Sequence, residues 1–294
     1  MLPTVLGVVV LLVGMALFFF PVAANEASQH EAEVVIRDAE AHAQSSGAAT
    51  KDSAAYKYLR SYNEQVREGE LTVNDPFGIG SNADELADVG LDNGVVGSLT
   101  VPSMDVYLPI YLGSTHENLE RGATLVAGTS APLGEESSNV VLAAHRGYYT
   151  NGLFRNIESV KEGDLLQIKT AWDTMVYRAV EIKVVGPNDG DSVAVRPGQD
   201  LVTLLTCHPY GTTRDRYLVV FERATDPDDL AAFETEEAEA SGPLAAVVAP
   251  LTEALEPCDS PALVAERWAR VFGLVVMAFM LVWAVGLLVK RARK

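Results

Sequence analysis

The chain has 294 residues, which is enough for one substantial domain with accessory segments. Its formal net charge of -18 excludes a protein that binds nucleic acid mainly through charge, because a phosphate backbone requires clustered Lys and Arg side chains. The acidity concentrates between Arg223 and Arg267, a stretch rich in Ala, Glu and Pro that contains no basic residue. This composition predicts a solvated acidic tether over residues 225–266.

Two uncharged segments near the ends of the chain predict membrane spans. Residues 2–20 and 271–289 carry no charged side chain. At a rise of about 1.5 Å per residue, a helix of either length just crosses a hydrocarbon layer of about 30 Å. We therefore expect residues 1–24 to form a transmembrane helix or signal anchor, with a cleaved signal peptide as the alternative.

A basic cluster after the second apolar segment predicts the orientation in the membrane. Basic residues at a membrane exit tend to stay in the cytoplasm. We expect residues 267–294 to form a transmembrane helix with a cytoplasmic tail, and residues 25–265 to lie outside the cell at its membrane. The basic residues of that tail are Lys290, Arg291, Arg293 and Lys294.

The segment over residues 25–94 is predicted to hold short helices and a loop. Helix-forming residues with scattered apolar positions fill residues 26–43 and 52–68, and the helix-breaking run Ser-Ser-Gly at 45–47 separates them. Residues 74–94 are polar and rich in Gly, which is typical of a surface loop.

Short β-type runs at regular intervals begin at Val95, separated by Gly, Pro and Asn. The pattern predicts a mainly β fold, a single barrel or sandwich over residues 95–224, and it disfavours alternating βαβ units. A helix-like turn is expected over residues 152–160. The expected strands are 97–110, 139–145, 165–170, 175–185, 201–207 and 217–222.

The two cysteines of the chain differ in their surroundings. An oxidising exterior would permit a disulfide between Cys207 and Cys258, but Cys258 falls in the predicted tether while Cys207 ends an apolar strand. A free thiol outside the cell suggests a nucleophile. The alternative is that Cys207 is a small buried apolar side chain.

Three predicted strand ends carry residues suited to acyl transfer: Cys207, Arg216 nine residues later, and His145, 62 residues before the cysteine. A free thiol with a pKa of about 8.5 needs a neighbouring base or cation near neutral pH. His145 can carry a proton between thiol and leaving amine, and Arg216 can stabilise a negative carbonyl oxygen. The alternative is a buried Cys, a surface His and a solvated Arg.

Four other histidines compete for the role of proton carrier. His30 and His42 fall on the predicted polar helices and His116 in a loop, so we expect these three to be solvated. His208 adjoins Cys207 and is the main rival, although it would point to the opposite side of an extended strand.

These motifs resemble those of the sortases over roughly residues 95–224. The matching text is LPIY at 108–111, GTS at 128–130, AHRG at 144–147, TLLTC at 203–207 and PYG at 209–211. The resemblance implies a closed sortase-type β-barrel and a cysteine transpeptidase with Cys207, His145 and Arg216 as its catalytic residues.

The AHRG and TCxPYG motifs and the C-terminal apolar segment are most similar to those of class C sortases, which build pili. That resemblance implies a lid of Asp75, Pro76 and Phe77, in which the carboxylate faces the arginine and the ring shields the thiol. The alternative is an ordinary turn. The chain differs from the class C wording at Arg214 and at His208, and either residue could assist catalysis.

The implied reaction is cleavage of an LPXTG-like sorting signal and transfer of the acyl group to a pilin lysine amine. Alternatives are a housekeeping sortase that anchors surface proteins to the cell wall, a non-catalytic membrane-tethered β module that binds peptides, and a general cysteine protease. The implied partners are pilins or surface proteins bearing sorting signals, and the membrane. The spacing of His, Cys and carboxylates resembles no ligand set, so we expect neither metal nor cofactor.

Overall fold

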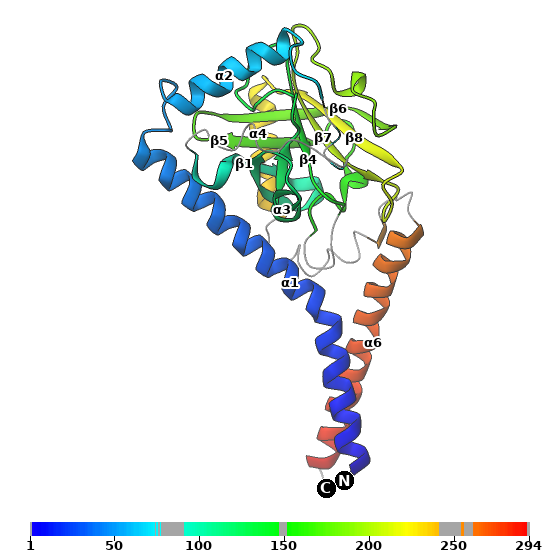
Figure 1. Ribbon diagram of the computed structural model, residues 1–294. Helices are drawn as coiled ribbons and strands as arrows, with labels where there is room; N and C mark the ends of the chain where they lie inside the picture. Colours follow the sequence, from blue (N-terminus) through cyan, green and yellow to red (C-terminus); the bar gives the residue numbers. More distant parts are fainter. Residues whose placement is uncertain are drawn as a thin grey trace. The chain divides into compact units, whose positions relative to one another are not determined.

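The structure, a computed structural model, describes residues 2–73, 75, 77, 91–146, 152–240, 254–255 and 261–292. It divides into two compact units (Figure 1). One unit comprises Pro21–Ala240, and the other comprises Met1–Phe20 with Ser241–Lys294. All the candidate site residues that the structure describes belong to the first unit.

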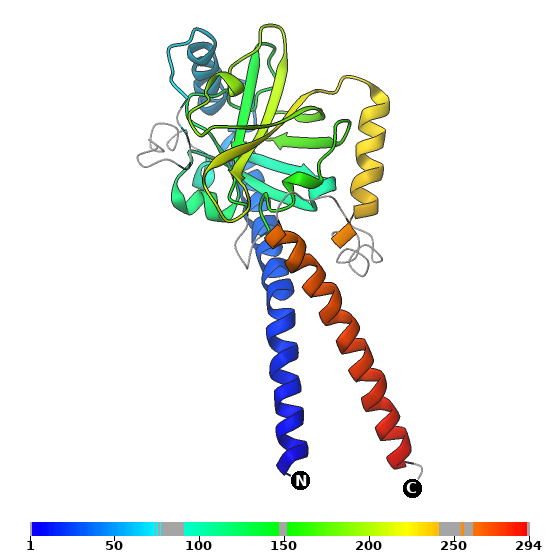
Figure 2. The same cartoon turned by 90° about the vertical axis from the view of Figure 1, so that its right-hand side faces the viewer.

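Eight strands form a closed barrel in the order β1-β2-β3-β4-β7-β8-β6-β5 (Figures 1 and 2). The predicted mainly β fold with a closed barrel is therefore confirmed. The strands are β1 (Val95–Val101), β2 (Val106–Leu112), β3 (Ala123–Leu125), β4 (Ser138–Ala143), β5 (Leu165–Thr170), β6 (Thr174–Val185), β7 (Asp200–His208) and β8 (Asp215–Arg223).

The barrel encloses one hydrophobic core built from alternate residues of these strands. Complete burial of such an aliphatic or aromatic side chain contributes about 1.5–3 kcal/mol. Side chains at the centre of the core have no exposed surface, among them Leu99, Ile110, Leu142, Val202 and Phe221. The opposite face of β4, β7 and β8 carries a smaller apolar cluster that includes Val141, Ala143, Leu205 and Leu218.

Two details of the strand prediction were wrong. The run over residues 97–110 is a hairpin of β1 and β2, because the one-turn 3-10 helix Pro102–Met104 and the positive φ of 53° at Asp105 reverse the chain. Strand β3 was missed because three residues are too short for a visible alternation. In the expected helix-like turn at 152–160, the structure has only the 3-10 helix Ile157–Ser159.

The N-terminal helices also differ from the prediction in length. Helix α1 (Leu2–Ser46) is continuous, so the expected separate short helix over 26–43 is wrong. Helix α1 ends before Gly47, which takes a left-handed φ of 78°. Helix α2 (Ala54–Arg67) agrees with the predicted helix over 52–68, and its N-cap is Ser53, whose side chain accepts a hydrogen bond from the Tyr56 N–H.

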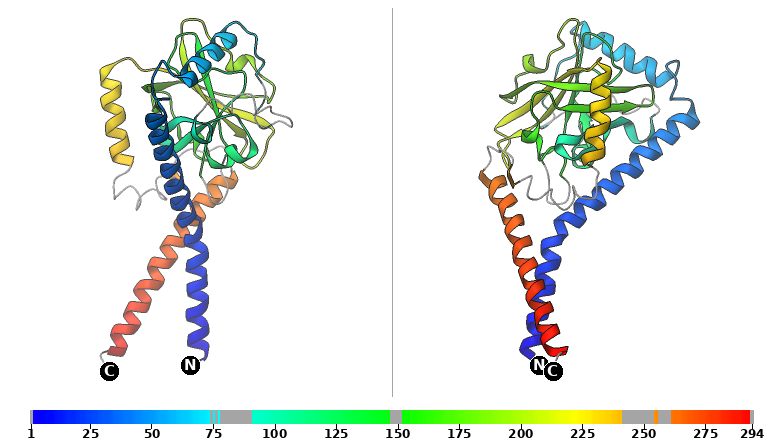
Figure 3. Two further views of the ribbon diagram at one scale, coloured as in Figure 1. Left: turned by 60° about the vertical axis from the view of Figure 1, so that its left-hand side comes forward. Right: turned by 180° about the vertical axis from the view of Figure 1, so that it is seen from behind.

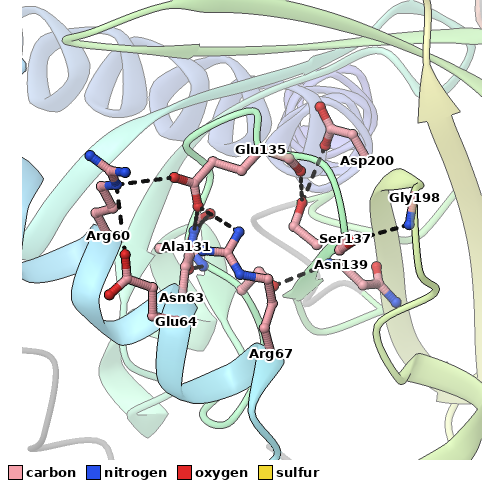
Figure 4. A network of polar contacts seen from close by, with 12 residues as sticks. Arg60, Asn63, Glu64, Arg67, Ala131, Glu135, Ser137, Asn139, Gly198 and Asp200 are labelled. Atoms are coloured by element: carbon pink, nitrogen blue, oxygen red, sulfur yellow. Dashed lines mark hydrogen bonds and ion pairs between the residues drawn. The ribbon is translucent and has the colours of Figure 1, made fainter.

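Helix α2 is anchored to the loop before β4 (Figure 4). The Asn63 side chain accepts from the Ala131 N–H at 2.7 Å and donates to the Ala131 carbonyl at 3.2 Å. Both Asn63 and Arg67 also donate to the Glu135 carboxylate. The Tyr62 hydroxyl accepts from the Gly128 N–H at 2.9 Å. These contacts fix the position of α2, which ends at Arg67, shortly before the segment that leads into residue 71.

The expected tether at 225–266 contains a helix that the sequence does not predict, α4 (Pro227–Ala240), shown in yellow in Figure 3. Its Phe233 is 1% exposed and packs against Leu165 and Val176, while Asp229 pairs with Arg178. A single aromatic residue in an acidic segment gives no helical periodicity, which explains the omission. Residues 241–253 and 256–260, including Cys258, lie outside the described residues.

The second apolar segment lies in helix α6 (Pro261–Ala292). Among the residues that the structure describes, none of the helices is both long and apolar enough to cross a membrane. The two membrane spans therefore stay predictions from the sequence.

Candidate active site

Three neighbouring strands place the predicted catalytic residues in one row. Strand β7 pairs antiparallel with β8, and Cys207 lies directly opposite Arg216. Strand β4 runs parallel to β7 with Ala143 opposite Leu205, and the Ala144 N–H donates to the Leu205 carbonyl at 3.3 Å. This offset of 62 residues, continued by two positions, puts His145 beside Cys207.

The row faces away from the barrel core. Ala143, Leu205 and Leu218 belong to the apolar cluster on the opposite face of the sheet. Side chains two residues further along a strand return to the same face, and neighbouring strands lie about 4.8 Å apart. Thiol and guanidinium therefore project side by side from β7 and β8. His145 lies two residues beyond the end of β4, and its ring reaches the same face, because the Phe77 ring contacts both His145 and Arg216.

The Cys207 thiol is largely buried, with 8% of the residue exposed. Burial raises the pKa of Cys207, and the negative charge of Asp75 acts in the same direction, while Arg216 and Arg146 lower it in part. The thiol is therefore protonated near neutral pH in this arrangement.

The His145 imidazole is in the opposite situation. Burial lowers the pKa of His145, a second imidazole at His116 lowers it further, and Glu120 partly compensates. A neutral imidazole beside a protonated thiol can accept the thiol proton, which produces a thiolate and an imidazolium ion.

The Arg216 guanidinium is 4% exposed and fully engaged. Its Nε and Nη2 donate to the two carboxylate oxygens of Asp75 at 2.9 and 2.6 Å. Its Nη1 donates to the carbonyls of Thr213 and Asp215, both at 2.9 Å. Burial is the largest influence and would lower the pKa of Arg216, but the hydrogen bonds to Asp75 and the nearby negative charges, among them Asp75 and Asp215, together outweigh it and raise the pKa, so the guanidinium stays charged.

The predicted lid residues lie directly on this row. The Phe77 ring is 5.3 Å from the Arg216 guanidinium carbon and 5.4 Å from the His145 ring centre. Phe77 also packs against the apolar cluster that contains Leu205 and Leu218. Asp75 and Phe77 together occupy the space in front of the imidazole and the guanidinium. The third predicted lid residue, Pro76, lies outside the described residues.

Comparison with known proteins decides the family. The sortase-domain profile matches residues 99–224. The solved structure of Streptococcus agalactiae sortase C1 is 33% identical, with a TM-score of 0.54, and the alignment covers 60% of this chain and 88% of that one. The chain belongs to the sortase family.

Several solved structures similar to this sortase are class C sortases. Streptococcus pneumoniae sortase C is 29% identical with a TM-score of 0.56, and the match covers 65% of this chain and 97% of that one. Among curated relatives, sortase D of Bacillus subtilis is 26% identical over 132 residues, which are 44% of this chain. The match spans 64% of that relative's own length.

Two competing residues lie away from the row in this sortase. Arg214 is exposed and pairs with Asp215 at 2.8 Å. His208 lies on the other face of β7, where its Nδ1 contacts Arg146 at 3.2 Å. His208 therefore does not share the face of β7 that carries the thiol, and Arg214 extends into solvent beside Asp215.

The sequence did not predict that His116 lies close to His145. His116 begins helix α3 (His116–Arg121) instead of lying in a loop, and its ring centre is 6.1 Å from that of His145. The side chain is 80% exposed and pairs with Glu120 at 3.4 Å, so the expected solvation holds. No local signal predicts the contact, because it depends on the packing of α3 beside the end of β4.

A cavity of about 460 Å³ opens beside Arg216 on the same face. Its floor is apolar, its rim includes exposed Asp189 and Asp191, and Thr72 and Val73 border it on the lid side. The apolar residues of the floor are Val126, Val193, Leu205 and Leu218. Such a groove suits an extended apolar peptide whose carbonyl group reaches the row. Within the described part of the chain, no cluster of His, Cys, Asp and Glu could hold a metal ion.

Proposed function

We propose that this sortase is a cysteine transpeptidase that cleaves an LPXTG-like sorting signal and joins the acyl group to a pilin lysine amine. The observation that carries the proposal is the row of His145, Cys207 and Arg216 on one face of three paired strands. The solved structure of Streptococcus pneumoniae sortase C, described in terms of catalysis and pilin substrate specificity, supports a pilin as substrate.

The first half-reaction forms a thioester. Cys207 transfers its proton to His145, and the thiolate sulfur attacks the threonine carbonyl carbon of the signal. Arg216 stabilises the negative charge on the carbonyl oxygen. The tetrahedral intermediate collapses as the His145 imidazolium protonates the departing glycine amine, which leaves an acyl group on Cys207.

The second half-reaction transfers that acyl group. A neutral lysine amine attacks the thioester carbonyl, His145 accepts the amine proton, and the Cys207 thiolate leaves. The product is an isopeptide bond between two subunits. The apolar groove beside Arg216 would hold the residues of the signal that precede the cleaved bond.

We further propose that Asp75, Pro76 and Phe77 form a lid that must open before the signal binds. This is supported by the contacts of Asp75 and Phe77, because the carboxylate occupies Nε and Nη2 of Arg216, the donors that an oxyanion would need. Attachment to the cell membrane, with the catalytic unit outside and the C-terminus in the cytoplasm, is supported by the two apolar segments and the basic tail.

Trapping of the thioester tests the reaction. The full-length chain in detergent is incubated with an LPXTG peptide and analysed by mass spectrometry. We expect the acyl group on Cys207 in the wild type, no adduct in Cys207→Ala, and strongly reduced adduct in His145→Ala and Arg216→Ala. Peptide binding by the wild type without any adduct would instead identify a non-catalytic binding module.

Competition between amines tests the acceptor. A pilin fragment with its lysine and a peptidoglycan-type amine are supplied together, and the two products are separated by mass. We expect the pilin isopeptide to predominate. Predominance of the cell-wall product would favour a housekeeping sortase, and predominance of the free acid would favour a protease.

A further inference from the structure

A buried charged cluster lies behind the catalytic row, on the other side of the strands. It consists of Arg146, Glu158 and His208, whose side chains are 4%, 5% and 12% exposed. Arg146 Nη1 lies 3.2 Å from His208 Nδ1, and that nitrogen is 3.5 Å from the Glu158 carboxylate. Arg146 and Glu158 also form a direct ion pair. We call these three residues the clamp.

Two clamp residues directly follow the two reactive groups in sequence. Arg146 follows His145 at the end of β4, and His208 follows Cys207 at the end of β7. Successive side chains on extended chain point to opposite faces, so the clamp lies behind the sheet while imidazole and thiol lie in front. A change in the separation of Arg146 and His208 is therefore passed to the two reactive side chains.

The backbone ladder stops just before this point. Pairing of β4 with β7 ends at Ala143 and Leu205, after which the Ala144 N–H donates to the Leu205 carbonyl. The Thr206 hydroxyl then donates to the Ala144 carbonyl at 2.7 Å. Beyond residue 144, the clamp is a direct side-chain connection between the two strand ends.

Glu158 reaches the clamp from a third element that is itself firmly held. It belongs to the 3-10 helix Ile157–Ser159, in which Ile157 is fully buried. The Ser159 hydroxyl donates to the Ser103 carbonyl at 2.8 Å. The Phe154 N–H of the same segment donates to the His145 carbonyl at 3.1 Å, so this segment also holds the backbone of the proton carrier.

We propose that Glu158 is a positioning residue: its carboxylate holds Arg146, whose guanidinium donates to His208 Nδ1, and this connection sets the separation of His145 and Cys207. This inference rests on the proposed transpeptidase function. Glu158 acts through Arg146 and, through Arg146, on His208. Its negative charge compensates a guanidinium that is nearly inaccessible to water, and loss of that charge leaves a buried cation unpaired and drives the strand ends apart.

The assignment gives His208 a role different from that of a proton carrier. Its Nδ1 accepts a hydrogen bond from Arg146 when the ring is neutral, and a side-chain amide oxygen can occupy the same place. His208→Asn therefore keeps the clamp, whereas His208→Ala removes one corner of it. An amide cannot carry a proton in general acid-base catalysis, so the two roles predict opposite results for His208→Asn.

The first experiment measures kcat and KM for peptide cleavage by the full-length chain. We expect Glu158→Gln and His208→Ala to lower kcat about 10- to 100-fold with little change in KM, because a displacement of the reactive groups of about 1 Å has effects of this size. His208→Asn is expected to retain most of the activity. The control is Glu162→Gln, an exposed carboxylate four residues further along.

Several results would overturn the proposal. One is unchanged kcat in Glu158→Gln, and another is an effect confined to KM. A third is a loss of kcat that only follows the folded fraction measured by circular dichroism. His208→Asn as inactive as His208→Ala would make His208 a proton carrier and would equally end the clamp assignment.

A second readout needs no substrate and so separates this inference from the function it rests on. The pH dependence of Cys207 alkylation by iodoacetamide is measured in wild type, His145→Ala, Glu158→Gln and the double variant. We expect His145→Ala to change the alkylation midpoint in the wild-type background and much less when Glu158 is Gln. Equal changes of the midpoint in both backgrounds would refute the clamp even if the transpeptidase reaction is established. A change that depends on Glu158, found in an enzyme that forms no thioester, would refute only the reaction.

Discussion

Replacement of Asp75 by Asn is the sharpest test of the lid. The variant keeps the size of the side chain and removes the charge that binds Arg216 through hydrogen bonds of 2.9 and 2.6 Å. The two side chains are only 13% and 5% exposed, so solvent screens the pair little. In the open state water replaces these contacts, and only the net difference holds the lid closed.

The expected size follows from those contacts. A hydrogen bond to a charged group contributes about 1.5–3 kcal/mol, and an amide retains part of one such bond, so we expect a net loss of about 2 kcal/mol. This corresponds to an increase of about 30-fold in the fraction of open lid, since about 1.4 kcal/mol is a factor of ten. The contacts of Phe77 with Arg216 and His145 remain, so the lid is weakened and not abolished.

Alkylation of Cys207 as a function of pH separates access from acidity. The plateau rate at high pH, where the thiol is fully ionised, reports how often the lid is open. The midpoint of the pH curve reports the pKa of Cys207. The Asp75 charge raises this pKa in the wild type, so it should be lower in Asp75→Asn. The matched control is Glu70→Gln, an exposed carboxylate just before the lid segment.

A plateau rate in Asp75→Asn equal to that of the wild type would refute the lid reasoning. The same would follow if Glu70→Gln raised the plateau by an equal amount, since the effect would then reflect general loss of acidic charge.

Three further predictions follow from the same structure. First, burial lowers the pKa of the His145 imidazole and raises that of the Cys207 thiol. The plot of kcat/KM against pH should therefore show a broad plateau that falls on the acid side at the imidazole pKa and on the basic side at the thiol pKa. A single rise towards the thiol pKa would contradict this. Second, Gly128→Ala should raise the plateau rate of Cys207 alkylation and destabilise the fold by more than Gly198→Ala. Both glycines have positive φ, which costs about 1–2 kcal/mol for Ala. At position 128 the added Cβ would also collide with the backbone of Thr72 and Val73, which leads into the lid, whereas at position 198 it meets no atom. Asn63→Ala should lower the free energy of unfolding, measured with urea, by about 2–3 kcal/mol, while the exposed Gln65→Ala should change it little; equal effects would show that α2 is not held by this amide.

The sequence predicts most of the barrel because its strands carry period-two apolar patterns that survive in isolation. The expected strand over residues 165–170 coincides with β5, and β7 and β8 differ from expectation by at most two residues at either end. Strand β3 and helix α4 escape prediction because their formation depends on contacts with distant residues. For α4 the decisive contact is Phe233 against Leu165 and Val176.

The residues of the candidate site likewise fall into those that the sequence predicts and those that only the fold reveals. Cys207, His145 and Arg216 stand at strand ends that the sequence marks, and the common offset of the strands brings them together. Glu158 gives no comparable signal, because an acidic residue in a short turn reads as exposed. Only the fold shows that its carboxylate is buried against Arg146.

The carboxylate seated on Arg216 has a consequence for product release. Hydrolysis of the acyl-enzyme would yield a peptide ending in a free carboxylate, which carries the same charge and the same two oxygens as the Asp75 side chain. Such an acid would compete for the guanidinium and dissociate slowly, whereas an isopeptide offers only a neutral amide. Under the proposed function, the product of hydrolysis would therefore inhibit the enzyme that made it, whereas an isopeptide product would be released without this competition.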